Sequence, residues 1–269
     1  MIAVIGLVVL GFCAVAGYML REASGCNIVE EEVSLRRLPS SFDGTRLFFI
    51  SDIHRRTIDD RELAALMQHD KPHLVIIGGD MTEAGVPLER CRHNIRMLSR
   101  LGPVMAVHGN HDYRADIRKL DDMLRELGVK VLDNEAVRLE RDGAWIWLVG
   151  WDDFSTGRTN AKLSMLDVKQ EPGCTIVVTH DPLSLRGENL DGIDLVLSGH
   201  THGGQICLPG LGPVRTGKFY RQYLAGWYPF ADKNGHCTRL FISRGYGTSH
   251  APVRLCSPPE VHFITLRAR

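Results

Sequence analysis

Five short clusters of carboxylate, imidazole and amide side chains recur along the sequence, and each follows an apolar run. Carboxylates together with imidazoles suit Mn, Fe, Zn, Co or Ni better than Ca or Mg. Each cluster alone is a common pattern with an ordinary structural explanation, but five in series are hard to obtain by chance. The clusters are Asp52-Ile53-His54, Gly78-Gly79-Asp80, Gly109-Asn110-His111-Asp112, His180-Asp181 and Gly199-His200-Thr201-His202.

Seven apolar runs have the length and the β-rich composition of strands, and five of them precede these clusters. Helical patterns separate several runs, and this succession predicts parallel strands with helices over the sheet faces. The carboxyl ends of such strands meet at one edge, so we expect the clusters to converge there. The predicted strands are 46–50, 74–77, 104–107, 144–149, 175–178, 195–197 and 239–242, and the predicted helices are 59–69, 87–101 and 115–127.

Spacing and composition also constrain how the clusters are held. Residues 52 and 54 are two apart, as are 200 and 202, and in extended backbone both side chains of such a pair point to the same side.

No Gly-, Ser- or Pro-rich linker divides residues 27–269, which predicts a single domain there. The last third of the chain has more strand than helix, so a mixed sheet or a second sheet is expected.

Residues 1–26 differ in kind from the rest of the chain. No charge occurs from Ile2 to Leu20, a run that makes about 28 Å of helix, close to the ~30 Å hydrocarbon core of a bilayer. A cleaved export signal and a buried core helix are alternatives, but no Lys or Arg precedes the run as in a cleaved signal. We expect a retained single-pass anchor in the cell membrane. Because Arg21, Arg36 and Arg37 lie on its carboxyl side, the positive-inside rule favours a cytoplasmic location for residues 27–269.

Charge and cysteine content argue against several classes of protein. Lys plus Arg and Asp plus Glu each number 32, so the chain has no net positive charge of the kind that favours binding to nucleic acid. We therefore expect no nucleic-acid partner. The seven cysteines are scattered and contain no CxxC pair. This distribution argues against a disulfide framework and against a cysteine zinc site.

The ordered series D-x-H, GGD, GNHD, a strand-end His and GHTH resembles the calcineurin-like metallophosphoesterases over residues 45–269. GHTHGGQ at 199–205, ISRGYG at 242–247 and PVRL at 252–255 resemble the branch typified by the YaeI and YkuE phosphoesterases. The resemblance implies an α/β fold, a four-layer α/β/β/α sandwich of mixed sheets, here with an N-terminal transmembrane helix. It also implies two divalent transition-metal ions. One would bind Asp52, His54, Asp80 and His202, and the other would bind Asp80, Asn110, His180 and His200.

His111 directly follows the implied ligand Asn110 and cannot ligate in the same way. We expect His111 to protonate the leaving oxygen or to stabilise the transition state, with Asp112 orienting its ring. Two ions about 3.5–4 Å apart can hold a hydroxide between them and offset negative charge on the phosphoryl oxygens.

The sequence thus predicts a metal-dependent phosphohydrolase that cleaves a phosphodiester or pyrophosphate bond by attack of a metal-bridged hydroxide. The branch includes a membrane-bound UDP-2,3-diacylglucosamine hydrolase, so a lipid-linked substrate in the bilayer is one expectation. A phosphomonoesterase or nucleotide phosphodiesterase for soluble substrates is an alternative. A catalytically inert scaffold is a further alternative, and the complete ligand set together with His111 counts against it.

Overall fold

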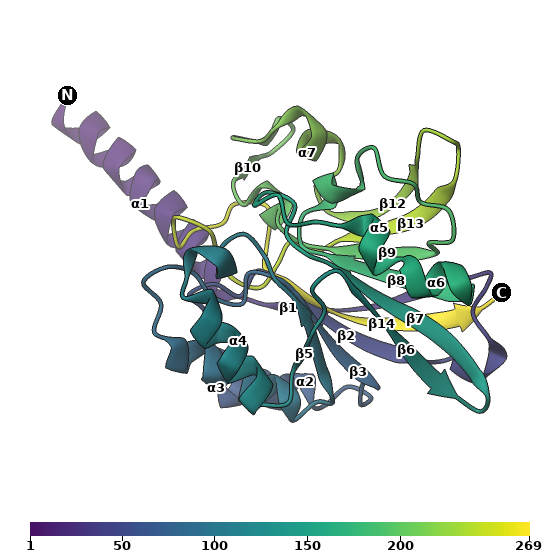
Figure 1. Ribbon diagram of the computed structural model, residues 1–269. Helices are drawn as coiled ribbons and strands as arrows, with labels where there is room; N and C mark the ends of the chain where they lie inside the picture. The colour runs from purple at the N-terminus through teal and green to yellow at the C-terminus, as the bar shows by residue number, and fades with distance from the viewer.

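The computed structural model describes residues 1–269, apart from the side chains of Ile2 and Ala3. Two six-stranded sheets pack face to face at its centre (Figure 1). In the first sheet all neighbours are parallel except β14 and β2, which are antiparallel. Its strands, in spatial order, are β1 (Asn27–Leu35), β14 (Glu260–Ala268), β2 (Arg46–Ile50), β3 (Leu74–Gly78), β4 (Val104–Val107) and β5 (Lys130–Val131).

The second sheet has a parallel centre and an antiparallel strand at each edge. It is therefore mixed, like the first sheet, as the excess of strand in the last third predicted. Its strands, in spatial order, are β12 (Gly226–Ala231), β13 (Cys237–Ile242), β9 (Leu195–Ser198), β8 (Cys174–Thr179), β7 (Ala144–Trp151) and β6 (Glu135–Arg141).

Helices cover the outer face of each sheet, and this confirms the four-layer α/β/β/α arrangement. The first sheet is covered by α2 (Asp60–Leu66), α3 (Leu88–Ser99) and α4 (Ile117–Glu126), and the second by α5 (Ala161–Ser164) and α6 (Leu166–Gln170). A hairpin of β10 (Cys207–Leu208) and β11 (Gly212–Pro213), followed by α7 (Lys218–Gln222), connects β9 to β12. Short 3-10 turns span Ser40–Phe42, Asp112–Arg114, Pro182–Leu185 and His202–Gly204.

The apolar core between the sheets explains why the central strands are almost continuously hydrophobic. Every residue of β3 and β8 is buried, because one face meets the other sheet and the opposite face meets a helical layer. Phe49 of β2 and Phe241 of β13 lie edge to face across the interface, with ring centroids 6.2 Å apart. This packing fixes the two sheets against each other and therefore fixes the loops at their carboxyl ends.

The first helix, α1 (Ile2–Ser24), projects away from the sandwich (Figure 1). By length and composition it qualifies to cross a membrane, and none of residues Val4–Ser24 is buried. Its last two turns are attached to the sandwich. The backbone amide of Arg254 donates to the carbonyl of Met19 at 3.1 Å, and that of Ser257 donates to the Glu22 carboxylate at 2.7 Å.

Candidate metal centre

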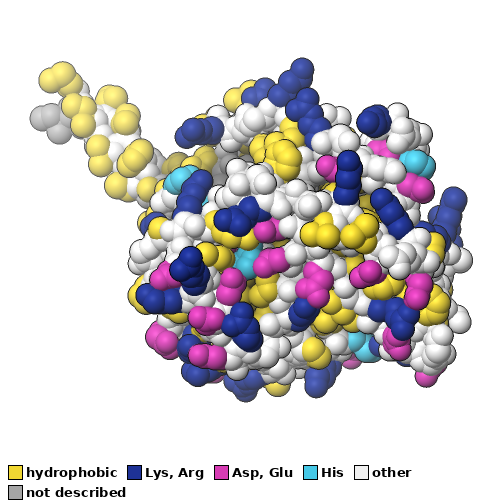
Figure 2. Space-filling view, in the orientation of Figure 1, with side chains coloured by type: hydrophobic (Ala, Val, Ile, Leu, Met, Phe, Trp, Pro, Cys, Tyr) yellow, Lys and Arg dark blue, Asp and Glu magenta, His cyan; other side chains and the backbone are white. Residues whose placement is uncertain are grey.

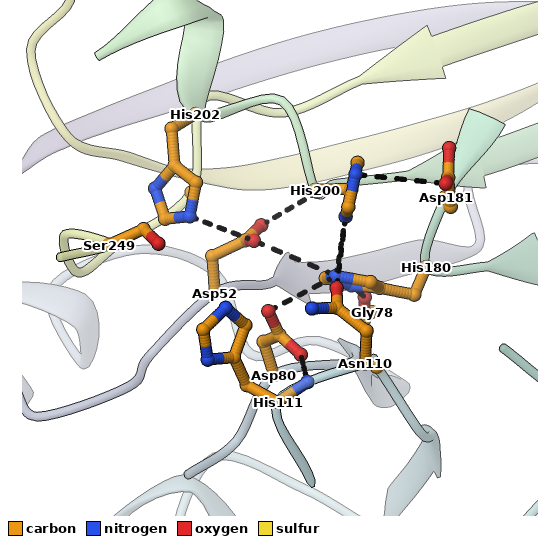
Figure 3. A network of polar contacts seen from close by, with 12 residues as sticks. Asp52, Gly78, Asp80, Asn110, His111, His180, Asp181, His200, His202 and Ser249 are labelled. Carbon is orange, nitrogen blue, oxygen red and sulfur yellow. Dashed lines mark hydrogen bonds and ion pairs between the residues drawn. The ribbon is translucent and has the colours of Figure 1, made fainter. Parts of the chain in front are cut away.

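The five sequence clusters converge at the carboxyl ends of the strands, as predicted (Figure 3). The first sheet supplies Asp52, Asp80 and Asn110, which follow β2, β3 and β4. The second sheet supplies His180 directly after β8 and His200 just after β9. The site therefore lies where the two sheets meet, and neither sheet alone holds its full set of donor atoms.

The backbone at these clusters is not extended, contrary to the expectation from the two-residue spacing. Five of the implied ligands have positive φ angles: Asp52 at 55°, His54 at 51°, Asp80 at 52°, His200 at 68° and His202 at 51°. Residues other than glycine rarely adopt this region, and holding one there costs of the order of 1–3 kcal/mol. The side chains of Asp52 and His54 converge because the chain turns sharply, not because a strand alternates.

One group of donor atoms consists of Asp52, His54 and His202, all buried. The Nε2 atoms of the two histidines are 3.1 Å apart, and their rings are stacked. Oδ1 of Asp52 lies 3.3 Å from Nε2 of His202 and 3.9 Å from Nε2 of His54. One carboxylate oxygen and two imidazole nitrogens, all able to bind a metal ion, therefore face the same point.

A second group consists of Asn110, His180 and His200. Nδ1 of His200 lies 3.1 Å from Oδ1 of Asn110 and 3.3 Å from Nε2 of His180. His200 and His202, although two residues apart, therefore face different groups.

Asp80 lies between the two groups. Its Oδ2 atom is 3.5 Å from Nε2 of His54, in the first group, and 3.2 Å from Nε2 of His180, in the second. Its other oxygen, Oδ1, accepts a hydrogen bond from the backbone amide of His111 at 2.8 Å. One carboxylate oxygen is thus directed at both sets of imidazoles, as a bridging ligand requires.

The donor set fits divalent transition-metal ions. With nitrogen–metal distances of about 2.0–2.1 Å, two nitrogens on one ion are roughly 2.8–3.4 Å apart, which agrees with the observed imidazole separations. Oδ1 of Asp52 is buried and has no hydrogen-bond partner among the described residues, so it remains available as a ligand. An unpaired buried carboxylate oxygen without a cation would be strongly unfavourable.

Three of the histidines have a polar oxygen near their outer nitrogen. Nδ1 of His54 lies 3.1 Å from the Glu83 carboxylate, Nδ1 of His180 lies 2.8 Å from the carbonyl of Gly78, and Nε2 of His200 lies 3.6 Å from Asp181. The hydrogen bond of His180 to the carbonyl places the proton on its outer nitrogen and leaves the inner one free for a metal, and the two carboxylates favour the same arrangement at His54 and His200.

The electrostatics of the site keep its carboxylates charged. Burial raises the pKa of Asp52, but His202 and His180 more than offset this, and the net pKa lies below the usual value. The pKa of Asp80 is likewise low, because His180 and His54 outweigh the effect of burial. Burial is also the largest influence on His202 and lowers its pKa to about 3. Burial lowers the pKa of His54 and of His180, but the nearby carboxylates more than offset this, and the net pKa of each lies above the usual value. The anionic form is the one in which Asp52 and Asp80 bind metal ions.

His111 lies beside the donor groups and is partly exposed. Its ring is 4.8 Å from that of His54, and its Nδ1 is 3.9 Å from the Glu83 carboxylate. Asp112 is not positioned as expected, because its two oxygens accept hydrogen bonds from the backbone amides of Thr82 and Gly109, at 3.0 and 2.9 Å. Asp112 therefore holds the two ligand loops together and does not orient the His111 ring, and burial raises its pKa to about 6.

Glu83 is a buried residue of the site for which the sequence predicted no role. It contacts His54, as described above, and forms an ion pair with Arg55. The imidazole of His54, 3.1 Å away, has the largest effect and lowers the pKa of Glu83 to about 2, so its carboxylate is ionised. No sequence motif includes Glu83, and its position three residues after Asp80 is the only feature of the sequence that could have indicated a role.

Arg254 is fully buried, and its guanidinium donates to backbone carbonyls close to the ligands and lies 3.4 Å from the ring nitrogen Nδ1 of His202. The distances are 3.2 Å to the carbonyl of His202 and 2.6 Å to that of Gly247, and further carbonyl acceptors are Arg244, Gly245 and Ser257. The PVRL string at 252–255 was part of the family resemblance, but the sequence predicted no role for Arg254. The guanidinium fixes the turn that directs His202 inward.

Two glycines allow the loops to approach this closely. Gly79 has a φ of 88°, and a Cβ atom there would lie 2.6 Å from Nδ1 of His180. Gly245 has a φ of 73°, and its Cβ would lie 2.6 Å from Cβ of Asp52. Any larger residue at these two positions would displace a donor side chain.

Arg55 and Arg56, which directly follow His54, lie outside the donor groups. Arg55 pairs with Glu83, and Arg56 pairs with Glu62 and donates to the carbonyls of Ser24 and Gly25 at the end of α1. The seven cysteines are all free, in agreement with the absence of a disulfide framework.

Comparison with known proteins agrees with this fold and site. The model of the calcineurin-like phosphoesterase family matches residues 45–204, which include every implied ligand. The chain belongs to this family and is a metal-dependent phosphoester hydrolase.

Several relatives match over most of the chain. It is 35% identical over 267 residues to the uncharacterized protein YpbG of Bacillus subtilis, covering 98% of this chain and 97% of that protein. It is 27% identical to phosphodiesterase YaeI of Escherichia coli, covering 82% of each. A transmembrane protein with metallophosphoesterase domain from Danio rerio is 30% identical, and the match covers 98% of this chain but 62% of that protein.

Among solved structures, the NAD nucleotidase NadN of Haemophilus influenzae superimposes with a TM-score of 0.51 at 15% identity. The match covers 75% of this chain and 45% of that one. At this identity the likeness concerns the fold alone.

Proposed function

We propose that the protein is a dinuclear-metal phosphohydrolase that cleaves a phosphodiester or pyrophosphate bond. The observation that supports this best is the position of Asp80, whose Oδ2 atom faces His54 on one side and His180 on the other. A single carboxylate oxygen between two imidazole groups matches a site for two ions better than a site for one.

In this proposal Asp52, His54, Asp80 and His202 hold one ion, while Asp80, Asn110, His180 and His200 hold the other. The imidazole donors favour Mn, Fe, Zn, Co or Ni. When bound, the two ions supply an activated water and offset the negative charge that builds on the phosphoryl oxygens. Glu83 and Asp181 keep the imidazoles of His54 and His200 in the orientation and tautomer that binding requires.

His111 is the proposed catalytic residue. It lies next to the donor groups without belonging to the proposed ligand set, and its partly exposed ring can reach a substrate. Burial lowers the pKa of the ring, although Asp80 opposes this effect. We infer that His111 donates a hydrogen bond or a proton to the leaving oxygen of the substrate.

The charge around the site favours a diester or pyrophosphate over a phosphate monoester. Arg55 and Arg244 lie close to the ligands but pair with Glu83 and Glu260, and Arg254 donates to backbone carbonyls. A terminal phosphate dianion is typically recognised by arginines that are free to form paired hydrogen bonds. These three arginines have partners already, which fits a phosphoryl group with one charge and two substituents.

We further propose that α1 anchors the protein in a membrane and that its substrate is lipid-linked, similar to a UDP-diacylglucosamine. The apolar length of α1 and its lack of burial support the anchor. The positions of Arg21, Arg36 and Arg37 favour a cytoplasmic catalytic domain formed by residues 27–269, separate from an anchor segment of residues 1–26.

A substrate comparison tests the proposed bond. Manganese-loaded protein would be assayed with bis-p-nitrophenyl phosphate, with p-nitrophenyl phosphate and with a UDP-linked lipid. We expect kcat/KM for the diester or the UDP-lipid to exceed that for the monoester. A clear preference for the monoester would instead identify a phosphomonoesterase and contradict the proposal. The variant Asp52→Asn is the matched inactive control, because it loses a ligand oxygen at nearly constant shape.

A further inference from the structure

An exposed apolar surface lies on the hairpin formed by β10 and β11. We call residues 207–214 the apolar hairpin. Leu208, Leu211 and Val214 leave 43%, 82% and 63% of their surface exposed. Large apolar side chains gathered on one exposed loop commonly mark a surface that contacts a membrane or another protein.

The segment that follows the apolar hairpin is basic. Arg215, Lys218 and Arg221 are exposed, and no acidic residue occurs between Asp194 and Asp232. Within the described part of the chain, none of the three forms an ion pair. Figure 2 shows Lys and Arg side chains close to hydrophobic ones at the top of the molecule, over β10 and α7. An apolar tip with a basic rim is complementary to an anionic lipid surface.

The apolar hairpin and α1 lie at the same end of the molecule (Figure 1). The loop of residues 248–253 lies next to both the segment before β10 and α1. On one side, Gln205 Nε2, two residues before β10, donates to the carbonyl of Ser249 at 2.9 Å. On the other side, Pro252 lines the same cavity as Leu20 of α1. A membrane that α1 enters would therefore lie close to this loop and to the apolar hairpin.

A pocket of about 320 Å³ runs between the apolar hairpin and this loop. It is lined by Ile206 and Val214 on one side and by His250 on the other, and it reaches the proposed ligand His202. Arg215 also lines it, next to Val214. The wall of the pocket beside the metal centre is thus formed by the segment that carries the exposed apolar surface.

We propose that the apolar hairpin is a second membrane contact, which inserts into the interfacial region of the bilayer crossed by α1. Insertion removes Leu208 and Leu211 from water, while Lys218 and Arg221 contact anionic headgroups. The pocket beside His202 then opens at the bilayer surface, where the phosphate of an amphiphilic substrate lies. This inference rests on the proposed anchoring by α1, but it does not depend on the bond that is cleaved.

Photo-cross-linking of the full chain in vesicles tests the contact. Benzoylphenylalanine replaces Leu211, or Leu208 as a second position, and the protein is reconstituted in phosphatidylcholine vesicles with or without phosphatidylglycerol. The matched control replaces Leu163, which is 52% exposed on α5, away from α1. Circular dichroism checks the fold of each protein, and mass spectrometry measures phospholipid adducts after irradiation.

We expect phospholipid adducts at positions 211 and 208 in several-fold excess over position 163. The yield should rise with phosphatidylglycerol, and Lys218→Gln combined with Arg221→Gln should remove that rise. Equal yields at 211 and 163 would overturn the proposal, as would adducts between two copies of the chain in place of lipid. Cross-linking needs no turnover, so failure of the phosphohydrolase assay leaves this result interpretable. Carbonate extraction of the same vesicles shows separately whether α1 anchors the chain.

Discussion

Nε2 of His180 lies 3.2 Å from Oδ2 of Asp80, although the two residues follow strands of different sheets. Both side chains are buried, so this contact forms only when the sheets have packed against each other. Asp80 has a strained backbone conformation, and four further strained positions, Asp52, His54, His200 and His202, lie around the contact. Because metal ions would bind this assembled site and not the unfolded chain, metal binding and folding should be linked.

Replacement of His111 separates catalysis from metal binding. If His111 acts on the leaving oxygen, His111→Ala should lower kcat by roughly 10²–10⁴-fold, because it removes a general acid. Metal content, measured by elemental analysis, should stay close to that of the unsubstituted protein. His236→Ala, at a half-exposed histidine that pairs with Asp232 away from the ligands, serves as the control and should leave kcat unchanged. Normal turnover in His111→Ala, or loss of its metal, would show that the role is misassigned.

Glu83→Gln tests the support of His54. The amide retains the size of the side chain but loses the charge that holds Nδ1 of His54. We expect metal affinity or activity to fall by about 10–100-fold, the usual cost of losing such a partner. A titration of metal into stripped protein measures this, with Glu89→Gln on the exposed face of α3 as control. Unchanged affinity and unchanged activity together would rule out the positioning role.

Arg254→Met should destabilise the whole fold. The substitution keeps much of the side-chain length but leaves the carbonyls of His202 and Gly247 without their buried donor. We expect the free energy of unfolding to fall by about 3 kcal/mol or more. Denaturant unfolding of the metal-free protein measures the change. Arg221→Met, at an exposed arginine, should change stability little, and an equally small effect at Arg254 would contradict the assignment.

Much of the fold was predictable because the central strands carry local signals. The predicted strand at 46–50 coincides with β2, and the predicted helices at 87–101 and 115–127 contain α3 and α4. These elements have a continuous apolar run or a clear helical period, so their sequence alone identifies them. The convergence of the five clusters followed from the parallel order of the strands.

The elements that were not predicted depend on contacts far away in the sequence. β1 contains Glu30, Glu31 and Glu32, a composition that does not suggest a strand, and it forms by parallel pairing with β14. The positive φ angles at Asp52 and His54 could not be predicted either, because packing and not residue type imposes them. Glu83 and Arg254 act through atoms that only the folded chain brings near the ligands.

The membrane anchor makes a prediction for the intact chain. We expect the full-length protein to sediment with membranes, to resist carbonate extraction and to retain residue 1 or 2 as its amino terminus. A mature chain that begins at Gly17, after the signal-like Ala14-Val15-Ala16, would replace the anchor with a cleaved signal. One that begins at Cys26 would replace it with a lipid attachment. For orientation, exposed Cys237 should react with an impermeant maleimide only after cell lysis, and labelling in intact cells would place the domain outside.

The number of bound ions tests the central claim most directly. Asp80→Asn weakens the ligand that the two ions would share, so it should lower the occupancy of both and reduce activity by more than about 100-fold. Asp122→Asn is the matched control, since that carboxylate only pairs with Arg125 on the surface. Elemental analysis of the intact protein should give about two transition-metal equivalents per chain, with diester hydrolysis lost on chelation and regained on adding metal. Protein without bound metal that still hydrolyses the diester in the presence of chelator would contradict the account.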